Sequence, residues 1–336
     1  MSLWYERLGL RHPVLQAGMG GGVVGPELAG AVSLAGGLGT IGNLAPESFA
    51  RAIRRAKALA GGRPVAANLL MPFTREGHVR ACLAERPSVV SLFFGHARGT
   101  VKRLQGAGIF VLHQVGTPDE ATRALADGAD GLIVQGHEAG GHLLARQRLA
   151  EALPAVLAVA AGRPVIAAGG IFDRSSAGRA ARLGASGVAA GTRFLLTRES
   201  GVHPAYQQRL LDAKSTIVTK LFGAAWPADH RVVPNAATER WCRDRPEGPS
   251  WVTAVHTLLV PTRWVTSPAS GLALARYQRA GRPLFTPLPM TSRSAPGDAD
   301  VTPLYAGECV AEIQAVRTAA DVVEDLAAGF AAGLTA

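Results

Sequence analysis

Short apolar runs that recur along the first 190 residues constrain the fold of this chain more than any other feature. Several of the runs are apolar almost continuously, without alternating polar residues. Strands that are buried on both faces have this pattern, and they occur in parallel sheets flanked by helices. The sequence therefore predicts eight parallel strands, at residues 14–16, 38–41, 65–68, 89–93, 109–114, 131–135, 165–168 and 187–190.

Helical patterns lie between most of these runs. Phe49, Ile53 and Ala56 share one helical face, and Thr117 starts a capping box that ends at Glu120. A final amphipathic helix is predicted at residues 321–332. Eight strands with intervening helices within about 190 residues favour an α/β fold of the (β/α)8 TIM barrel type, and an open doubly wound sheet is the alternative.

The strand and helix alternation stops near residue 202. Residues 203–300 hold most of the tryptophans and much proline, which is typical of an irregular, mostly helical second domain. We therefore expect residues 1–202 and 301–336 to form the barrel and residues 203–300 to form a smaller domain that covers the substrate.

The composition excludes several function classes. The net charge is +10, but the arginines are scattered and aromatic residues make up only 6%, which argues against a nucleic-acid partner. No apolar run is long enough to span a membrane, and the first residues do not resemble a signal peptide. Three distant cysteines predict no disulfide and no metal site, and they favour a cytoplasmic location. A homo-oligomer is compatible with the sequence.

Candidate functional residues follow from the barrel itself, because active sites of this fold lie at the C-terminal ends of the strands. Glycines and side-chain amides dominate those positions. The pairs Gly169–Gly170 and Gly191–Thr192 follow the last two strands, where barrels commonly bind phosphate. A GxGxxG pattern at Gly20, Gly22 and Gly25 lacks the acidic residue that a dinucleotide fold needs after its second strand.

His142 is the best catalytic candidate. It follows a glycine pair after the sixth strand, and a histidine of near-neutral pKa can remove a weakly acidic proton. A capping or surface role is the plain alternative. His96, His113 and His137 also follow or end strands, and we expect His96 and His113 to line the same mouth. The spacing of His137, Glu138 and His142 does not match a zinc motif.

These residues give the chain a family resemblance. It resembles the nitronate monooxygenases, formerly called 2-nitropropane dioxygenases, which are flavin-dependent TIM barrels. The resemblance is carried by HPVLQAGMGGG at 12–22, GADGLIVQGHEAGGH at 128–142, PVIAAGGIFD at 164–173 and LGASGVAAGTRFLLTRES at 183–200, with weaker echoes at 226–235 and 305–310.

The resemblance implies that the chain binds FMN and oxidises alkyl nitronates or nitroalkanes with O2 to carbonyl compounds and nitrite. His142 matches the active-site histidine of the family, which is the base when the substrate is a neutral nitroalkane. By position, the FMN contacts implied are Gln16, Ala17, Gly18, Met19, Asn68, Gln135, Gly140, Gly141, Ala168, Gly169, Gly170, Gly191 and Thr192.

A sister group shares nearly the same motif. The flavin-dependent enoyl-ACP reductases use FMN with NADH to reduce an acyl double bond, and they are the main alternative, beside another flavin oxidoreductase of the same superfamily. Leu143 and Leu144 follow the histidine here, and His113–Gln114 ends the fifth strand. These residues depart from the family pattern at the substrate mouth, so they bear on the substrate more than on the cofactor.

Overall fold

The structure is a computed structural model, and it describes residues 3–264 and 277–335. The chain divides into two compact units, which we describe one at a time. Unit 1 comprises Met1–Glu138, Leu144–Gly201 and Val316–Ala336, and unit 2 comprises Ala139–Leu143 and Val202–Ala315. In the described ranges, no helix combines the length and the apolar character needed to cross a membrane.

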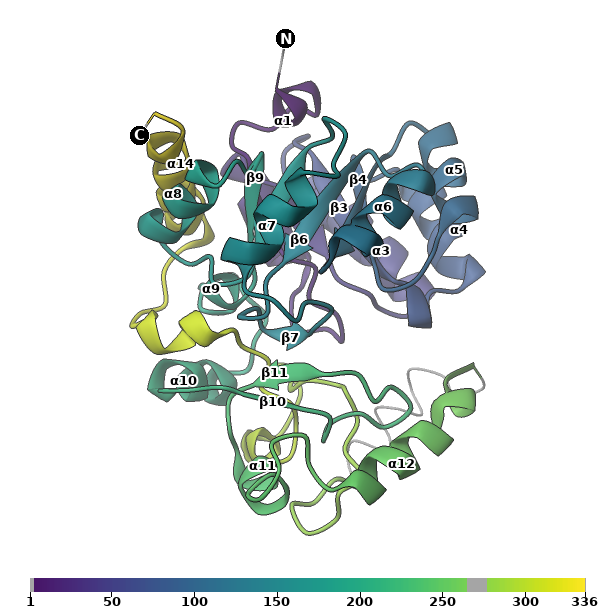
Figure 1. Cartoon of the computed structure of the whole chain (residues 1–336), viewed down its shortest axis with the longest axis vertical. Coiled ribbons are helices and arrows are strands. Elements are labelled where there is room, and N and C mark those ends of the chain that lie inside the picture. The colour runs from purple at the N-terminus through teal and green to yellow at the C-terminus, as the bar shows by residue number, and fades with distance from the viewer. Residues whose placement is uncertain (1–2, 265–276, 336) are drawn as a thin grey trace. The chain divides into compact units, whose positions relative to one another are not determined.

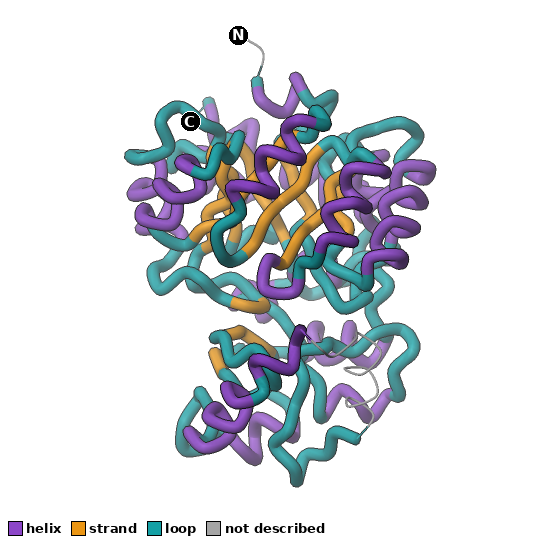
Figure 2. The backbone as a smooth tube through the Cα atoms, turned by 90° about the vertical axis from the view of Figure 1, so that its right-hand side faces the viewer, coloured by secondary structure: helices purple, strands orange, loops and turns teal. Residues whose placement is uncertain are grey.

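Eight parallel strands form the centre of unit 1. They are β1 (Val14–Gln16), β2 (Gly39–Ile41), β3 (Val65–Leu70), β4 (Val89–Phe93), β5 (Phe110–Val115), β6 (Gly131–Gln135), β8 (Val165–Ala168) and β9 (Gly187–Ala190), in the order β1-β9-β8-β6-β5-β4-β3-β2. A parallel bridge between Leu15 and Leu38 joins the two outer strands. The sheet therefore nearly closes, as in a TIM barrel, and the predicted α/β fold is confirmed (Figure 2).

Packing inside the sheet distinguishes a barrel from an open sheet. One buried side chain from each strand, or from the residue before β2, joins a single cluster. An open doubly wound sheet keeps its outer strands apart, so it does not bring residues of all eight strands into one cluster. The cluster contains Leu15, Leu38, Ala66, Val89, Leu112, Ile133, Ile166 and Ala189.

Helices surround these strands (Figure 1). Phe49, Ile53 and Ala56 are buried on one face of α3, as their spacing predicts. The Thr117 hydroxyl accepts a hydrogen bond from the Glu120 N–H at 3.2 Å, so α6 begins at its predicted cap. The helices are α1 (Trp4–Arg7), α2 (Pro26–Leu34), α3 (Pro46–Leu59), α4 (Glu76–Glu85), α5 (Arg98–Gly106), α6 (Pro118–Ala126), α7 (Leu149–Leu157), α8 (Arg174–Arg182), α9 (Thr192–Leu195) and α14 (Ala319–Leu334).

The last helix, α14, starts two residues before the predicted helix at 321–332 and ends two residues after it. It packs closely on α8 through glycines. A Cβ atom at Gly329 would lie 2.2 Å from the carbonyl oxygen of Arg174, and one at Gly333 would lie 2.4 Å from that of Gly178. Only a residue without a side chain allows the two backbones to approach this closely, so the C-terminal helix is fixed against the barrel.

Unit 2 combines short helices with a small sheet. The sheet is antiparallel, in the order β10 (Ile217–Thr219), β11 (His230–Val232) and β7 (Gly141–His142), and the sequence did not predict it. Leu221, Phe222, Val232 and Phe285 form its core with neighbouring residues. The helices are α10 (Pro204–Asp212), α11 (Ala236–Trp241) and α12 (Ser250–Leu258), with 3₁₀ turns at Val260–Trp264, Pro296–Asp300 and Glu308–Glu312. Residues 265–276 of the predicted second domain lie outside the described residues.

Candidate active site

Parallel pairing places most of the predicted cofactor residues at one edge of the barrel. Gln16 pairs with Ala190 across β1 and β9, and Gln135 pairs with Ala168 across β6 and β8. These are the last residues of their strands, so the segments that follow them leave the same edge. Those segments carry Ala17, Gly18, Met19, Gly169, Gly170, Gly191 and Thr192, and Asn68 lies near the end of β3. Gly140, Gly141 and His142 belong to unit 2.

Three side-chain amides at this edge are buried and fixed by hydrogen bonds within the barrel. The Gln16 Oε1 accepts from the Thr40 N–H at 2.9 Å, and the Gln135 Oε1 accepts from the Leu144 N–H at 2.8 Å. The Asn68 Nδ2 donates to the Ser91 hydroxyl at 2.9 Å. Each bond ties one strand end to a neighbouring segment, so the amides have fixed orientations toward any ligand.

The glycines at the same edge serve different purposes. A Cβ atom at Gly18 would lie 2.4 Å from the Asn68 Cβ, so this glycine allows the ends of β1 and β3 to approach. Gly169 and Gly170 have φ values of +112° and +64°, which L side chains rarely adopt. A Cβ atom at Gly191 would meet only the Ala17 Cβ, at 3.7 Å. The space beside Gly191 is therefore open.

Asn43 adds a feature that the predicted cofactor set does not include. It follows β2, and its Oδ1 is buried with no hydrogen-bond partner among the described residues. Buried polar atoms without partners are rare in proteins, and a ligand group is one common explanation. An orphan amide oxygen beside the glycine-rich segment after β1 suits a hydrogen-bonding heterocycle.

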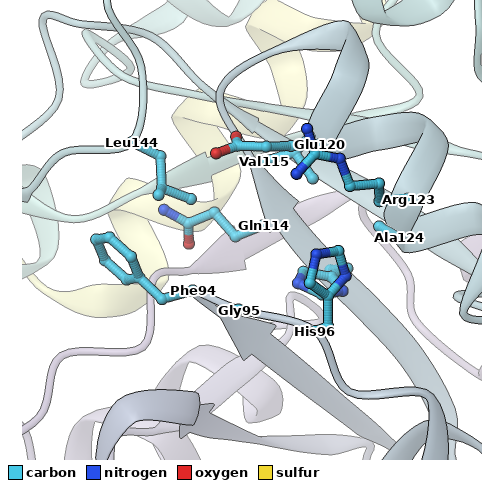
Figure 3. Close-up of a pocket in the computed structure, with 10 residues that line it drawn as sticks. Phe94, Gly95, His96, Gln114, Val115, Glu120, Arg123, Ala124 and Leu144 are labelled. Carbon is cyan, nitrogen blue, oxygen red and sulfur yellow. The ribbon is translucent and has the colours of Figure 1, made fainter.

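A cavity of about 150 Å³ lies in unit 1 near the ends of β4 and β5. It is lined by residues from both strand ends, from α6 and from the segment between β6 and α7, and His96 and His113 both line it. That these two histidines share a mouth with His142 stays a prediction. Figure 3 shows Phe94, Gln114 and Leu144 on one side of this space and His96 and Arg123 on the other. The lining residues are Phe94, Gly95, His96, His113, Gln114, Val115, Glu120, Arg123, Ala124 and Leu144.

The two histidines of this cavity differ in environment. His113 is 5% exposed, and burial lowers the pKa of its imidazole, although the Asp127 carboxylate acts in the opposite direction. The His96 Nδ1 lies 3.5 Å from the Asp127 Oδ2 on the exposed side. Phe94 has a φ of +61°, so the turn that brings His96 to the cavity is strained. His137 lies elsewhere, with its Nδ1 3.1 Å from the Ala145 carbonyl oxygen.

His142 lies in unit 2, in an aromatic cluster. Its ring stacks on Trp226 with centroids 3.7 Å apart and planes 19° from parallel. Its Cα pairs with that of His230 across β7 and β11, and the two rings are 5.2 Å apart. The ring of Tyr305 is 5.4 Å away. The surface or capping alternative for His142 therefore does not describe this environment.

Burial controls the protonation of this cluster. The pKa of His142 lies well below its ordinary value because burial penalises the charged ring, and His230 adds to the effect. Burial likewise lowers the pKa of His230 to about 4. Both rings are therefore neutral at neutral pH, and a neutral imidazole can accept a proton.

Sequence analysis missed three members of this cluster, Trp226, His230 and Tyr305. The signal was present, because all three fall in the weaker family echoes at 226–235 and 305–310. His230 lies on β11, and Tyr305 forms an isolated bridge with Val232 of the same strand. The strands β10, β11 and β7 are only two or three residues long. Such short strands have no readable periodicity.

The remaining reactive residues have structural environments. Glu138 accepts from the Leu149 N–H at 3.1 Å and so supports the start of α7. The three cysteines are free and buried, and burial raises the pKa of Cys82 to about 12. Within the described ranges, no three His, Cys, Asp or Glu side chains are arranged to hold a metal ion.

Comparison with known proteins places the chain in a family. A nearly closed eight-stranded α/β barrel with a glycine-rich strand-end edge defines a broad class of barrel proteins, many of them enzymes. The model of one family, nitronate monooxygenase, matches residues 2–79 and 73–329. The chain therefore belongs to the nitronate monooxygenase family, and it is an oxidoreductase enzyme.

Individual relatives carry different activities in their names. A Pseudomonas aeruginosa nitronate monooxygenase is 37% identical over 252 residues, which are 60% of this chain and 71% of that protein. A Mycobacterium tuberculosis protein named (3aS,4S,5R,7aS)-5-hydroxy-7a-methyl-1-oxo-octahydro-1H-indene-4-carboxyl-CoA dehydrogenase is 40% identical over 223 residues. That match spans 64% of this chain and 61% of the relative, less than two thirds of its length.

Two solved structures are similar along nearly the whole chain. FabK from Thermotoga maritima has a TM-score of 0.76 and 26% identity, and the match covers 97% of this chain and 94% of that chain. Nitroalkane oxidase from Streptomyces ansochromogenes has a TM-score of 0.75 and 27% identity, with 97% of each chain covered. The family and fold are therefore common to proteins of more than one named activity.

Proposed function

We propose that this protein is an FMN-dependent nitronate monooxygenase that oxidises alkyl nitronates and nitroalkanes with O2 to carbonyl compounds and nitrite. Family membership supports the class of reaction. The observation that carries the proposal is His142, a neutral imidazole stacked on Trp226 at the end of the segment that best matches the family. A base of this kind is what a neutral nitroalkane requires before oxidation.

The barrel edge fits FMN. The space beside Gly191 is open to a phosphate, in the region where barrels commonly bind one. The amides of Gln16, Asn68 and Gln135 and the orphan Asn43 Oδ1 offer hydrogen-bonding groups for a heterocycle. FMN, when bound, would supply the electron transfer and the oxygen chemistry of the reaction. The remaining predicted contacts are Ala17, Gly18, Met19, Gly140, Gly141, Ala168, Gly169, Gly170 and Thr192.

The chain's own contribution to catalysis is proton transfer. The α-carbon of a nitroalkane loses its proton to a ring nitrogen of His142, and the electron pair of the broken C–H bond moves into the nitro group to give the nitronate. The ring accepts this proton because burial keeps it neutral. The stack with Trp226 and the ladder to β11 fix the direction of the ring.

Replacement of His142 tests this role. His142→Ala should retain FMN, and it should lower kcat/KM for neutral nitroalkanes by about 10²–10⁴-fold, the usual contribution of a general base. Turnover of preformed nitronates should change far less, because they have already lost the proton. His203→Asn is the control, since it keeps a helix-capping side chain on α10 and lies outside the cluster. Equal losses on both substrates would refute a base role.

A second candidate function is reduction of an acyl double bond in a thioester-linked substrate with NADH, as in the enoyl-ACP reductase alternative. The specific observation that favours it is the similarity to a CoA dehydrogenase and to FabK. A flavin site at the barrel edge serves both candidates equally. The substrate pair decides between them, because only the first candidate releases nitrite and only the second consumes NADH.

Further features of the proposal concern the setting of the reaction. We propose a small nitronate or nitroalkane and O2 as the only partners in turnover, without nucleic acid, membrane or metal, in the cytoplasm. We also propose that residues 203–300 cover the substrate while residues 1–202 and 301–336 hold FMN.

A further inference from the structure

His230 carries a buried acceptor whose purpose the proposed reaction does not yet explain. The residue is fully buried, and its Nδ1 lies 2.9 Å from the Ala228 carbonyl oxygen. A carbonyl oxygen can only accept, so Nδ1 carries the hydrogen and Nε2 carries a lone pair. Nε2 is buried with no hydrogen-bond partner among the described residues. Buried acceptors of this kind are rare and call for an explanation.

The surroundings of His230 narrow the choice of donor. The rings of Phe222 and Tyr305 each lie 5.9 Å from its ring. Phe222 has no donor, and the Tyr305 hydroxyl already donates to the Pro287 carbonyl oxygen at 2.9 Å. The His142 ring is closer, at 5.2 Å and tilted by 54°, and it lies opposite His230 in the β7–β11 ladder.

Other titratable groups around these two strands are engaged or hold a proton firmly. Burial raises the pKa of Tyr206 and of Tyr305, so both stay protonated. The Tyr206 hydroxyl donates to the Tyr305 carbonyl oxygen at 2.9 Å. His256 contributes to the lowered pKa of His230. Burial lowers the pKa of His256 as well, so its ring is neutral. The charged residues form the pairs Lys220–Asp229, at 3.6 Å, and Arg231–Glu308, at 3.2 Å.

We propose that His230 is a positioning residue for His142. In the holoenzyme, the His230 Nε2 accepts a hydrogen bond from one ring nitrogen of His142, and the other ring nitrogen of His142 takes the proton of the substrate. The structure does not contain this hydrogen bond. His230 itself gains no proton and stays neutral, so the only bonds that change are the C–H bond of the substrate and the new N–H bond on His142. The inference rests on the proposed role of His142 as base.

In the proposed arrangement His142 is the base, and His230 is the group that orients it. In such systems, an acceptor behind the base selects its tautomer and stabilises the charge that it gains. Here the Ala228 carbonyl fixes the tautomer of His230, and His230 in turn fixes that of His142. The chain thereby offers a fully buried, uncharged acceptor in place of a carboxylate.

Two substitutions separate the acceptor from the bulk of the ring. His230→Phe keeps a buried ring without an acceptor, and His230→Gln keeps an amide oxygen that can accept. We expect His230→Phe to lower kcat/KM for nitroalkanes by about tenfold or more, the worth of one hydrogen bond to a charged group. His230→Gln should recover part of the loss. Both variants should turn over preformed nitronates at the parent rate and keep their FMN.

Nitrogen NMR of the histidine rings gives a reading that does not depend on turnover. In the holoenzyme we expect His230 in the Nδ1–H tautomer and His142 in a single tautomer. In His230→Phe, the His142 ring should become a mixture of its two tautomers, because it has lost the acceptor that selects one of them. In His230→Gln, the single tautomer should remain.

Three results would overturn the inference. The first is an unchanged His142 tautomer in His230→Phe. The second is an equal loss on nitroalkane and nitronate, which indicates a role in packing alone. The third is His230→Gln behaving as His230→Phe although both are folded; if His230→Phe does not fold, His230→Gln with NMR still decides. Failure of the base role itself would look different. The His142→Ala variant would then lose activity equally on nitroalkanes and nitronates, while NMR of the parent enzyme would still show His142 in a single tautomer.

Discussion

Acidification should destabilise unit 2 through His230. In the folded protein burial lowers the pKa of His230 from its ordinary value of 6.5 to about 4. In the unfolded chain the ring protonates near 6.5, so below that pH the unfolded state binds more protons and stability falls as the pH falls. One unit of pKa corresponds to about 1.4 kcal/mol, so the loss between pH 6.5 and pH 4 should reach about 3 kcal/mol from this residue.

Urea unfolding followed by tryptophan fluorescence measures this loss. Four of the five tryptophans lie in unit 2 and Trp4 lies in unit 1, so most of the signal reports unit 2. The free energy of unfolding should be flat above pH 7 and should fall between pH 6.5 and pH 4. His78, His113, His142 and His256 act in the same direction, because burial lowers the pKa of each. The comparison with His230→Phe isolates His230, and parallel curves for the two proteins would show that His230 does not cause the loss.

Two further predictions concern the cofactor edge and the core of unit 2. Gly191→Val should weaken FMN binding by about tenfold or more with little change in melting temperature, because its Cβ would contact only Ala17 while it occupies the space proposed for the phosphate. Gly99→Ala on α5 is the control. Unchanged FMN affinity of Gly191→Val in a fluorescence titration would place the phosphate elsewhere. Asn235→Ala should cost about 3 kcal/mol in urea unfolding, because Asn235 caps α11 and donates to the Ala299 and Thr302 carbonyls at 2.9 Å. Asn235→Asp should lose less because it keeps the cap, and equal losses would contradict this division.

The barrel was predictable because its strands are buried on both faces. The apolar runs place every strand of the barrel within two residues of its observed bounds, as at β4, which is 89–93 in both. The capping box at Thr117 likewise fixed the start of α6. The apolar runs do not distinguish a closed barrel from an open sheet, because the run at 14–16 does not predict a bridge from Leu15 to Leu38.

The sequence predicts those candidate site residues that lie at the C-terminal end of a strand. Gln16, Asn68 and Gln135 follow from the rule that barrels bind ligands at their C-terminal strand ends. The pairing of His142 with His230 does not follow from any local pattern, because β7 has two residues and pairs with a segment distant in sequence. Orphan atoms such as the Asn43 Oδ1 depend on three-dimensional packing, so sequence alone cannot identify them.

A nitronate monooxygenase of the proposed kind turns a nitronate into nitrite without a nicotinamide. The direct measurement mixes the purified, FMN-loaded protein with an alkyl nitronate in air and follows nitrite release and O2 consumption, with NADH present or absent. We expect nitrite release and O2 uptake that do not depend on NADH and that leave NADH unoxidised. Steady NADH oxidation that requires an enoyl thioester, with no nitrite from any nitronate, would contradict it and favour the reductase function.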